Sequence, residues 1–344
     1  MKEGWKVKKL GEVCEIYQPK TISTNALVEN GKYLVYGANG VIGKYDQYNH
    51  TESELLMTCR GATCGTINIS EPYSWINGNA MVIHPVEGNI TMSYLKYVLR
   101  GIDLSNVITG AAQPQITRQS LSPLLIPIPP LLEQSRIVEE LDLLSNIIEK
   151  KRQQLSELDN LAQSIFYDMF GDPVTNEKGF PLCTVGDIYK FQYGKGNKIP
   201  ENKGEYLCYG SNGVVGYHTN YNSEDSPIIG HIGAYAGIVN WGKGKHFVTY
   251  NGVICKLKDD RFNPIYGYYM LKNQNYMEKV RGGAAQPFVS YDLLESPQAV
   301  IPPLDLQQLF AQKIETIEKQ KALIKQSIAE TEELFNSRMD YYFS

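Results

Sequence analysis

Several short patterns in the chain come close to motifs that perform chemistry. The run from Gly37 to Gly43-Lys44 resembles a phosphate-binding loop, in which glycine N–H groups and a lysine hold a phosphate. Its spacing is one residue too long, and Tyr45 stands where a magnesium-binding Ser or Thr belongs. A later copy of this run has Tyr217 in place of the lysine. A hairpin turn explains the pattern better than a nucleotide site does.

The remaining chemical patterns also fail. Asn263-Pro-Ile-Tyr266 resembles the Asn-Pro-Pro-Tyr of amino-methyltransferases, but the second proline is missing and no Gly-rich cofactor loop precedes it. Pro264 instead suits the first turn of a short helix. The sequence has no Gly-x-Ser-x-Gly, no His-Glu-x-x-His and no repeated carboxylate pair. We therefore expect no catalytic residue, no cofactor of its own and no enzyme activity.

The cysteines and histidines do not suggest a metal site either. The six cysteines form no Cys-x-x-Cys pair, and the five histidines do not cluster with them. Buried free thiols in a reducing compartment are the better interpretation. No stretch approaches the ~20 apolar residues of a membrane span, so we expect a cytoplasmic protein that does not enter a membrane.

The dominant feature of the chain is an internal repeat. Gly110-Ala-Ala-Gln-Pro114 recurs as Gly283-Ala-Ala-Gln-Pro287, and residues 33–43 recur as residues 206–216, each 173 residues later. Ile128-Pro-Pro-Leu131 recurs at the same distance. Solenoid repeats run about 20–50 residues, so this one indicates a duplicated domain with its connector.

The first globular segment, residues 1–130, is expected to be mostly β. Residues 33–36 and 54–57 are short apolar runs bounded by Gly, Asn or Asp, as strands are. Asn39-Gly40 is a hairpin turn signal, and the helical spacing in residues 92–99 predicts one short helix. Residues 173–303 repeat this domain.

Each globular segment is followed by a long helix, over residues 131–172 and 304–344. Mostly apolar residues step by four and three along both segments, with Lys151 in the first and Lys321, Thr331 and Arg338 in the second as polar members, which predicts a heptad seam. In the first segment the apolar members are Ile137, Leu141, Leu144, Ile148, Leu155, Leu158, Ala162, Ile165 and Met169, and in the second Phe310, Ile314, Ile317, Ile324, Ile328, Phe335 and Tyr342.

The two seams are expected to pack on each other as an antiparallel coiled coil about 50 Å long. The fold class is then α+β, with two similar mostly-β domains separated by the paired helices and related by a pseudo-two-fold axis. The alternative is that both stripes form ordinary bundle core inside one globule.

The charge balance limits how the chain can bind a polyanion. The net charge is −4, although each globular segment has about one more basic than acidic side chain and the acidic excess lies in the helices. Strong non-specific DNA affinity needs many Lys or Arg contacts to phosphate. A DNA-binding function would therefore need local clustering of basic residues or a partner protein that supplies much of the affinity.

Taken together, these motifs resemble the specificity (S) subunit of type I restriction–modification systems, over the whole chain. The motifs are an opening with Trp5, Leu10-Gly11 and Val13, the Gly-Ala-Ala-Gln-Pro turn, and Ile-Pro-Pro-Leu followed by Glu133-Gln134. The second copy departs slightly. Phe180-Pro-Leu replaces the Trp opening, and Leu304-Asp-Leu-Gln-Gln308 lacks the Glu and is interpreted as one residue longer.

The resemblance implies a non-catalytic, DNA-recognition role. Each globular segment would be a target recognition domain that reads one half of a bipartite, asymmetric site in double-stranded DNA. The paired helices would set the spacing and dock two methyltransferase (M) subunits, which bring S-adenosylmethionine and methylate adenine. Restriction and translocation (R) subunits would complete the complex. Half-sites one helical turn apart lie about 34–36 Å from each other, which such a rod can bridge.

The repeat helps to choose DNA-contacting candidates, because positions identical in both copies cannot distinguish two half-sites. Arg60 (opposite Ile232) and Arg118 (opposite Tyr291) are candidates for bidentate guanine contacts. Other polar positions that differ between the copies are Lys44, Thr63, His218 and Tyr235. Candidates for phosphate contacts are Lys20, Lys195, Lys198, Lys243 and Lys245. The alternative for each is a solvated surface side chain.

Two further interpretations stay open. Gln113 and Gln286 are expected to be structural amides that close their turns onto the sheet, with direct base contact as the second possibility. For the whole chain, the alternative function is a tandem β-domain scaffold that binds glycans or protein through its Tyr-rich surface, with the helices as a coiled-coil spacer. A self-contained nuclease or methyltransferase is disfavoured by the missing motifs.

Overall fold

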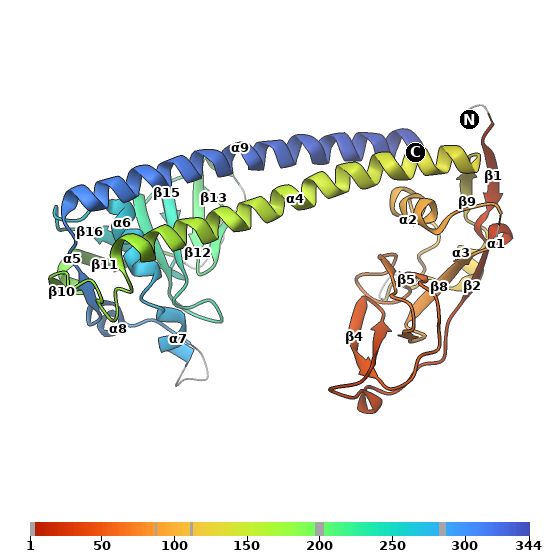
Figure 1. Ribbon diagram of the computed structural model, residues 1–344, viewed down its shortest axis with the longest axis horizontal. Helices are drawn as coiled ribbons and strands as arrows, with labels where there is room; N and C mark the ends of the chain where they lie inside the picture. The colour runs from red at the N-terminus through yellow and green to blue at the C-terminus, as the bar shows by residue number, and fades with distance from the viewer. Residues whose placement is uncertain (1–3, 87, 111–112, 197–202, 282–286) are drawn as a thin grey trace. The chain divides into compact units, whose positions relative to one another are not determined.

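The computed structural model describes residues 4–86, 88–110, 113–196, 203–281 and 287–344, without the side chain of Arg281 (Figure 1). The chain forms two compact units. Unit 1 comprises Met1–Lys151 and Gln326–Ser344, and unit 2 comprises Arg152–Lys325. Both boundaries fall inside the long helices, so each unit contains one globular part and about half of each helix.

The globular part of unit 1 is built from three small sheets. A four-stranded sheet has the order β2-β8-β5-β6, a three-stranded sheet has the order β4-β3-β7, and β1 pairs with β9. All described pairings are antiparallel except β3 with β7. The strands are β1 (Lys6–Lys9), β2 (Cys14–Tyr17), β3 (Tyr33–Gly37), β4 (Gly40–Tyr45), β5 (Leu55–Thr58), β6 (Ile67–Ile69), β7 (Trp75–Ile76), β8 (Ala80–Pro85) and β9 (Leu125–Ile128).

Unit 2 repeats this strand sequence but joins two of the sheets. Its six-stranded sheet has the order β11-β16-β14-β15-β12-β13, and β10 pairs with β17. The strands are β10 (Leu182–Thr184), β11 (Tyr189–Tyr193), β12 (Tyr206–Gly210), β13 (Gly213–His218), β14 (Ser223–Gly230), β15 (Val239–Val248), β16 (Gly252–Leu257) and β17 (Gln298–Val300).

The joining strand is β15, which takes the place of both β6 and β7. In unit 1, Pro72 lacks a backbone N–H and Tyr73 adopts φ +52°, so the segment between β6 and β7 cannot continue a ladder. The corresponding residues 242–247 have no proline and stay in β15, which pairs with both β14 and β12. The segment that follows β6 is therefore a bend in unit 1, whereas its counterpart in unit 2 is part of a strand.

Short helices complete the globular parts. They are α1 (Leu10–Val13), the 3₁₀ turn η1 (Thr24–Ala26), α2 (Met92–Gly101) and α3 (Arg118–Leu121) in unit 1, and α5 (Val185–Ile188), α6 (Pro264–Lys272), α7 (Tyr276–Arg281) and α8 (Tyr291–Glu295) in unit 2. Pro264 occupies the first turn of α6, and the Asn263 side chain accepts a hydrogen bond from Ile265 N at 2.9 Å. Pro264 thus lies in the first turn of a short helix, as predicted, and Asn263 caps that helix.

The long helices α4 (Leu131–Phe170) and α9 (Leu304–Phe343) each contain 40 residues and lie side by side (Figure 1). In unit 1, Arg338 Nη2 donates to Glu140 Oε2 at 2.9 Å, and Lys151 Nζ donates to Ser327 Oγ at 2.6 Å. Residue numbers rise along α4 as they fall along α9, so the pair is antiparallel, as predicted.

The apolar stripes of α4 and α9 contact the globular cores as well as each other. In unit 1, Leu141 of α4 and Phe343 of α9 belong to one core with Tyr94 of α2. In unit 2, Phe166 of α4 packs against Phe310 of α9 and Tyr266 of α6, with ring centroids 5.7 and 5.9 Å apart. The seam residues of each helix therefore contact the other helix and also form part of the core of a globular part.

A buried glutamine fastens each long helix to its globular part. In unit 1, Gln134 Oε1 accepts from Thr91 N at 2.9 Å, and its Nε2 donates to the carbonyls of Asn89 and Pro129. In unit 2, Gln307 makes the equivalent bonds, to Asn263 N and to the carbonyls of Arg261 and Pro302.

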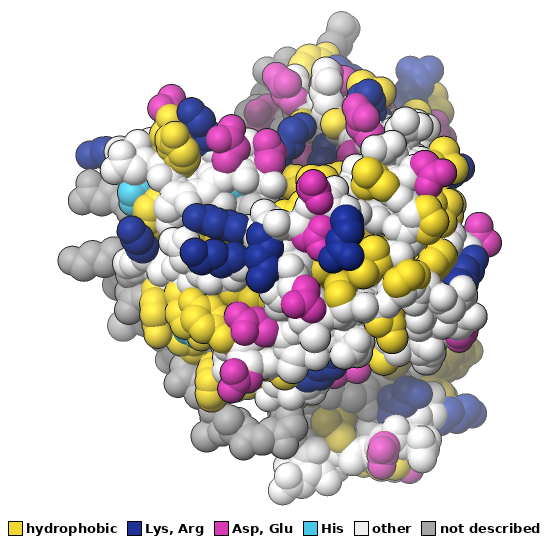
Figure 2. All heavy atoms as spheres, turned by 90° about the vertical axis from the view of Figure 1, so that its left-hand side faces the viewer, with side chains coloured by type: hydrophobic (Ala, Val, Ile, Leu, Met, Phe, Trp, Pro, Cys, Tyr) yellow, Lys and Arg dark blue, Asp and Glu magenta, His cyan; other side chains and the backbone are white. Residues whose placement is uncertain are grey.

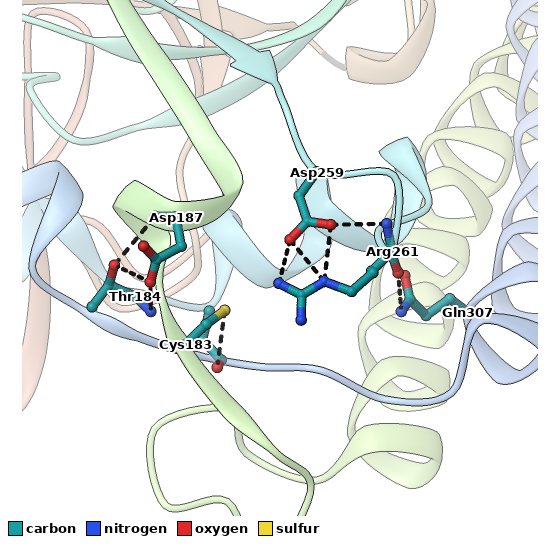
Figure 3. A network of polar contacts seen from close by, with 7 residues as sticks. Cys183, Thr184, Asp187, Asp259, Arg261 and Gln307 are labelled. Atoms are coloured by element: carbon teal, nitrogen blue, oxygen red, sulfur yellow. Dashed lines mark hydrogen bonds and ion pairs between the residues drawn. The ribbon is translucent and has the colours of Figure 1, made fainter.

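Gln307 closes a polar network in which the Arg261 guanidinium binds Asp259 and holds the pKa of that carboxyl below its ordinary value (Figure 3). Because Gln307 occupies the place of Gln134, the second helix begins in register with the first. The extra residue expected after Leu304 does not exist.

Candidate nucleic-acid interface

In unit 1, two of the repeated motifs lie against each other. The loop after β5 meets the Gly-Ala-Ala-Gln-Pro segment through a β-bridge between Arg60 and Gln115. Gly61 N donates to Pro114 O at 3.0 Å, and Ile116 N donates to the carbonyl of Cys59 at 3.0 Å. Residues far apart in sequence thus form one surface at the end of the sheet, which we name the repeat loop cluster.

Unit 2 builds the same cluster with the same contacts. Ile232 and Phe288 form the equivalent bridge, and Gly233 N donates to Pro287 O at 2.9 Å. The tip of the β12–β13 hairpin joins it, because Ser211 Oγ donates to the carbonyls of Ile232 and Asn251 at 2.9 and 2.8 Å. The shared Gly and Pro residues therefore form a common backbone frame, as the repeat predicted.

Glycine is required at two of these turns. Gly61 has φ +85° and Gly110 has φ +84°, which side chains rarely adopt. A Cβ on Gly110 would also lie 2.5 Å from the carbonyl oxygen of Gln113. The turn itself is closed by backbone bonds of 2.8 Å between Thr109 and Gln115 in both directions.

The Gln113 side chain is exposed and makes no hydrogen bond to any residue in the described part of the chain. Its structural role stays a prediction. Gln286 lies outside the described residues.

In unit 1, the structure brings four of the predicted residues to the repeat loop cluster or its border. Arg60 and Thr63 lie in the loop after β5, and Arg118 begins α3 directly after the segment that pairs with this loop. Lys20 lies one residue from Thr21, whose hydroxyl accepts from Gly78 N at 3.1 Å. All four are exposed, and no carboxylate among the described residues pairs with Arg60 or Arg118.

In unit 2, Lys195 and Tyr235 reach the cluster. Lys195 N donates to Val248 O at 3.1 Å, which places this exposed lysine beside Tyr250. Tyr235 lies in the loop after β14 and is 48% exposed. Lys198 lies outside the described residues.

The other predicted residues lie on strands away from the cluster. His218 and Lys44 lie toward the open ends of the β12–β13 and β3–β4 hairpins, at the opposite end from the hairpin tips. The His218 ring stacks on Phe247 at 3.7 Å, and Lys245 lies 4.7 Å from the Tyr221 ring centre. Lys243 shares strand β15 with Lys245. Basic and acidic side chains are interspersed over one face of unit 2 (Figure 2).

The titratable groups do not form a catalytic arrangement in the described part of the chain. Burial raises the pKa of Cys14 to about 12 and that of Cys183 to about 11, so neither thiol ionises readily as a nucleophile. No group of three His, Cys, Asp or Glu side chains among the described residues could hold a metal ion. None of the described helices is long and apolar enough to span a bilayer.

Comparison with known proteins agrees with the duplicated architecture. A family model described as "Type I restriction modification DNA specificity domain" matches twice, over residues 2–160 and 175–333. The chain belongs to this family. Each match covers one globular part and most of the helix that follows it.

Relatives in this family are distant. The chain is 24% identical over 275 residues to a putative type I restriction enzyme MjaX specificity subunit from Methanocaldococcus jannaschii, covering 70% of this chain and 64% of the relative. It is 27% identical over 144 residues to a putative specificity subunit, S.HindORF215P, from Haemophilus influenzae, covering 40% and 37%. The chain thus spans less than two thirds of the length of these relatives.

Solved structures agree on the fold. The S subunit of a type I restriction–modification system from M. genitalium matches with a TM-score of 0.65 at 16% identity, over 99% of this chain and 96% of that one. A chain from a structural study of complex assembly in the type I system matches with a TM-score of 0.58 at 17% identity, over 100% and 98%. The α+β fold predicted for the specificity family is confirmed.

Proposed function

We propose that this chain is the DNA-recognition and scaffold subunit of a type I restriction–modification complex. The recognition domains are residues 1–130 and 173–303, and each reads one half of a bipartite, asymmetric site. The observation that supports this most strongly is the repeat loop cluster. Both units build it on the same glycine and proline frame, yet the exposed side chains on that frame differ between the units.

The long helices, residues 131–172 and 304–344, act as the spacer. A 40-residue helix is about 60 Å long, which exceeds the ~34–36 Å between half-sites one turn apart. Leucines that point away from the paired seam support a second role for the helices in docking partners. Leu132 and Leu143 on α4 and Leu323 and Leu334 on α9 are all at least half exposed. Two M subunits would bind these outer faces.

Catalysis is assigned to the partners. Among the described residues no group of three His, Cys, Asp or Glu side chains could hold a metal ion, and the chain itself contributes recognition and geometry. M subunits would bring S-adenosylmethionine and methylate adenine, and R subunits would translocate and cut. The near-neutral charge of each globular part fits weak DNA binding by the chain alone.

A gel-shift measurement tests the proposal. The chain alone should bind duplex DNA weakly and with little sequence preference, and adding its M subunit should produce tight binding to one bipartite site. Arg60→Ala should weaken that specific complex, while Lys258→Ala, which changes an exposed residue beyond the end of β16 that is away from the cluster, should not. Equal affinity with and without the M subunit would contradict the proposal.

One observation favours a second candidate function. Unit 2 exposes aromatic side chains at its cluster, and such surfaces also bind sugars and proteins. A tandem β-domain scaffold that binds glycans or protein would show binding on a glycan array or to a protein ligand without any requirement for DNA.

A further inference from the structure

The exposed side chains of the two repeat loop clusters differ in polarity, and they do so in the same sense at every equivalent position. In unit 1 the cluster presents polar groups, and in unit 2 the equivalent positions are apolar or aromatic. Equivalence is supported by the matching bridges, Arg60 with Gln115 and Ile232 with Phe288. The equivalent pairs are Arg60 and Ile232, Thr63 and Tyr235, Gln115 and Phe288, and Arg118 and Tyr291.

Beneath this surface, unit 2 contains a stack of aromatic rings. Tyr193 stacks on Tyr291 with centroids 4.4 Å apart and an interplanar angle of 13°, and on His231 at 4.3 Å and 29°. The Tyr291 hydroxyl accepts a hydrogen bond from Tyr193 N at 3.2 Å, and His231 Nδ1 donates to Tyr250 O at 3.0 Å. The Tyr250 ring contacts the His231 ring edge-on at 5.0 Å, and both Tyr250 and Tyr291 stay partly exposed, at 40% and 36%.

The same positions touch in unit 1 but are small or polar. Strand register places Gln18 where unit 2 has Tyr193, since Tyr17 pairs with Val82 and Gln192 pairs with Ile254. Gln18 Nε2 donates to Cys59 Sγ at 3.1 Å and to Gly78 O at 3.0 Å. Cys59 and Gly78 are the counterparts of His231 and Tyr250. These three contacting positions are therefore small or polar in unit 1 and aromatic in unit 2.

A basic residue flanks the cluster at the same position in both units. Lys20 follows Gln18 by two residues, and Lys195 follows Tyr193 by two residues. Both lysines are exposed. A shared cation beside a surface that differs between the units is the arrangement expected when phosphate contacts give position and base contacts give sequence. This favours DNA over a glycan or protein as the occupant of the aromatic surface.

We propose that the aromatic surface of unit 2, formed by Tyr235, Tyr250, Phe288 and Tyr291, recognises thymine through its C5-methyl group in the major groove. The methyl is the apolar feature that a base edge offers there. The counterpart surface of unit 1, with Arg60, recognises guanine through O6 and N7. The inference rests on the proposed function, and it predicts that the two half-sites differ in chemistry.

The test uses the intact chain in complex with its M subunit. Adenine-methylation mapping first defines the bipartite site, and Phe288→Ala and Arg60→Ala show which half each unit reads, by loss of discrimination in that half. Both residues are exposed, and thermal melts confirm that the variants fold. Duplexes are then made with deoxyuridine for thymidine, or 7-deazaguanine for guanine, in one half at a time.

Deoxyuridine in the half read by unit 2 should weaken binding by about 4-fold for each contacted methyl that is lost. The same change in the other half should leave the affinity unchanged. 7-Deazaguanine should weaken binding by at least about 5-fold in the half read by unit 1. Because the protein is unaltered in these measurements, misfolding cannot produce the result.

Specific binding that is insensitive to deoxyuridine would overturn the inference and leave the proposed function intact. Absence of any sequence-specific binding by the complex would overturn both.

Discussion

The buried amide of Gln134 offers a direct test of how the recognition domain is fastened to the spacer helix. Gln134→Leu removes three hydrogen bonds, with Thr91 N, Asn89 O and Pro129 O, while roughly preserving the volume of the side chain. Gln134 is 0% exposed, so water cannot replace these bonds without opening the helix start.

The magnitude follows from those contacts. A hydrogen bond contributes about 1 kcal/mol net, and a buried partner left unsatisfied costs about 1–3 kcal/mol. Three lost bonds therefore predict a loss of about 3 kcal/mol or more in the unfolding free energy of unit 1. For a unit of this size, that is a fall of about 6–12 °C in Tm. Urea unfolding gives the free energy, and hydrogen exchange shows whether the loss falls in unit 1.

The matched control is Gln326→Leu on α9, because Gln326 is exposed and, among the described residues, its side chain bonds to Glu330 alone, at 2.8 Å. It should change the stability by less than about 0.5 kcal/mol. The repeat supplies a second test, since Gln307→Leu should cause a similar loss in unit 2. If Gln134→Leu cost no more than Gln326→Leu, the proposed anchor would be refuted.

Three further predictions concern unit 2. Burial lowers the pKa of His246 below its ordinary value of 6.5, so as the pH falls below about 6.5 the unfolded chain takes up a proton first and unit 2 loses stability. Urea unfolding at several pH values should show a weaker loss for His246→Asn, and equal slopes would contradict this. Asn263→Ala removes the α6 cap and should cost about 1 kcal/mol in the same assay, unlike Asn220→Ala, which changes an exposed residue whose side chain bonds to no described residue. Lys195→Ala should lower DNA affinity for all sequences alike and reduce the salt dependence of binding by about one phosphate contact, whereas a change in the recognised sequence would exclude a phosphate role.

Local signals in the sequence were sufficient where neighbouring residues decide the structure. The Pro-Pro-Leu segments and the heptad spacing predicted helices that begin at Leu131 and Leu304, where α4 and α9 begin. The repeated Gly-Ala-Ala-Gln-Pro segment predicted a shared frame, and in both units the proline of this segment accepts a backbone hydrogen bond from the glycine of the β5 or β14 loop. Pro264 predicted the first turn of a short helix, and α6 begins at this residue.

Contacts between distant segments could not be predicted in the same way. Residues 242–247 form part of a strand because β14 and β12 pair with them on both sides. The aromatic stack of unit 2 joins Tyr193, His231, Tyr250 and Tyr291, which come from four separate segments. The available signal was a comparison of the two copies. Tyr250 of the second copy stands where the first copy has Gly78, beside a turn that both copies share.

The central claim is that one chain presents two different DNA-reading surfaces on one repeated frame. Adenine-methylation mapping of the host genome, with the gene present, deleted, or carrying Arg60→Ala or Phe288→Ala, tests it most directly. The account predicts one bipartite methylated motif that disappears on deletion, with each variant relaxing a different half of it. Methylation that is unchanged by deletion, or variants that relax the same half, would contradict the claim.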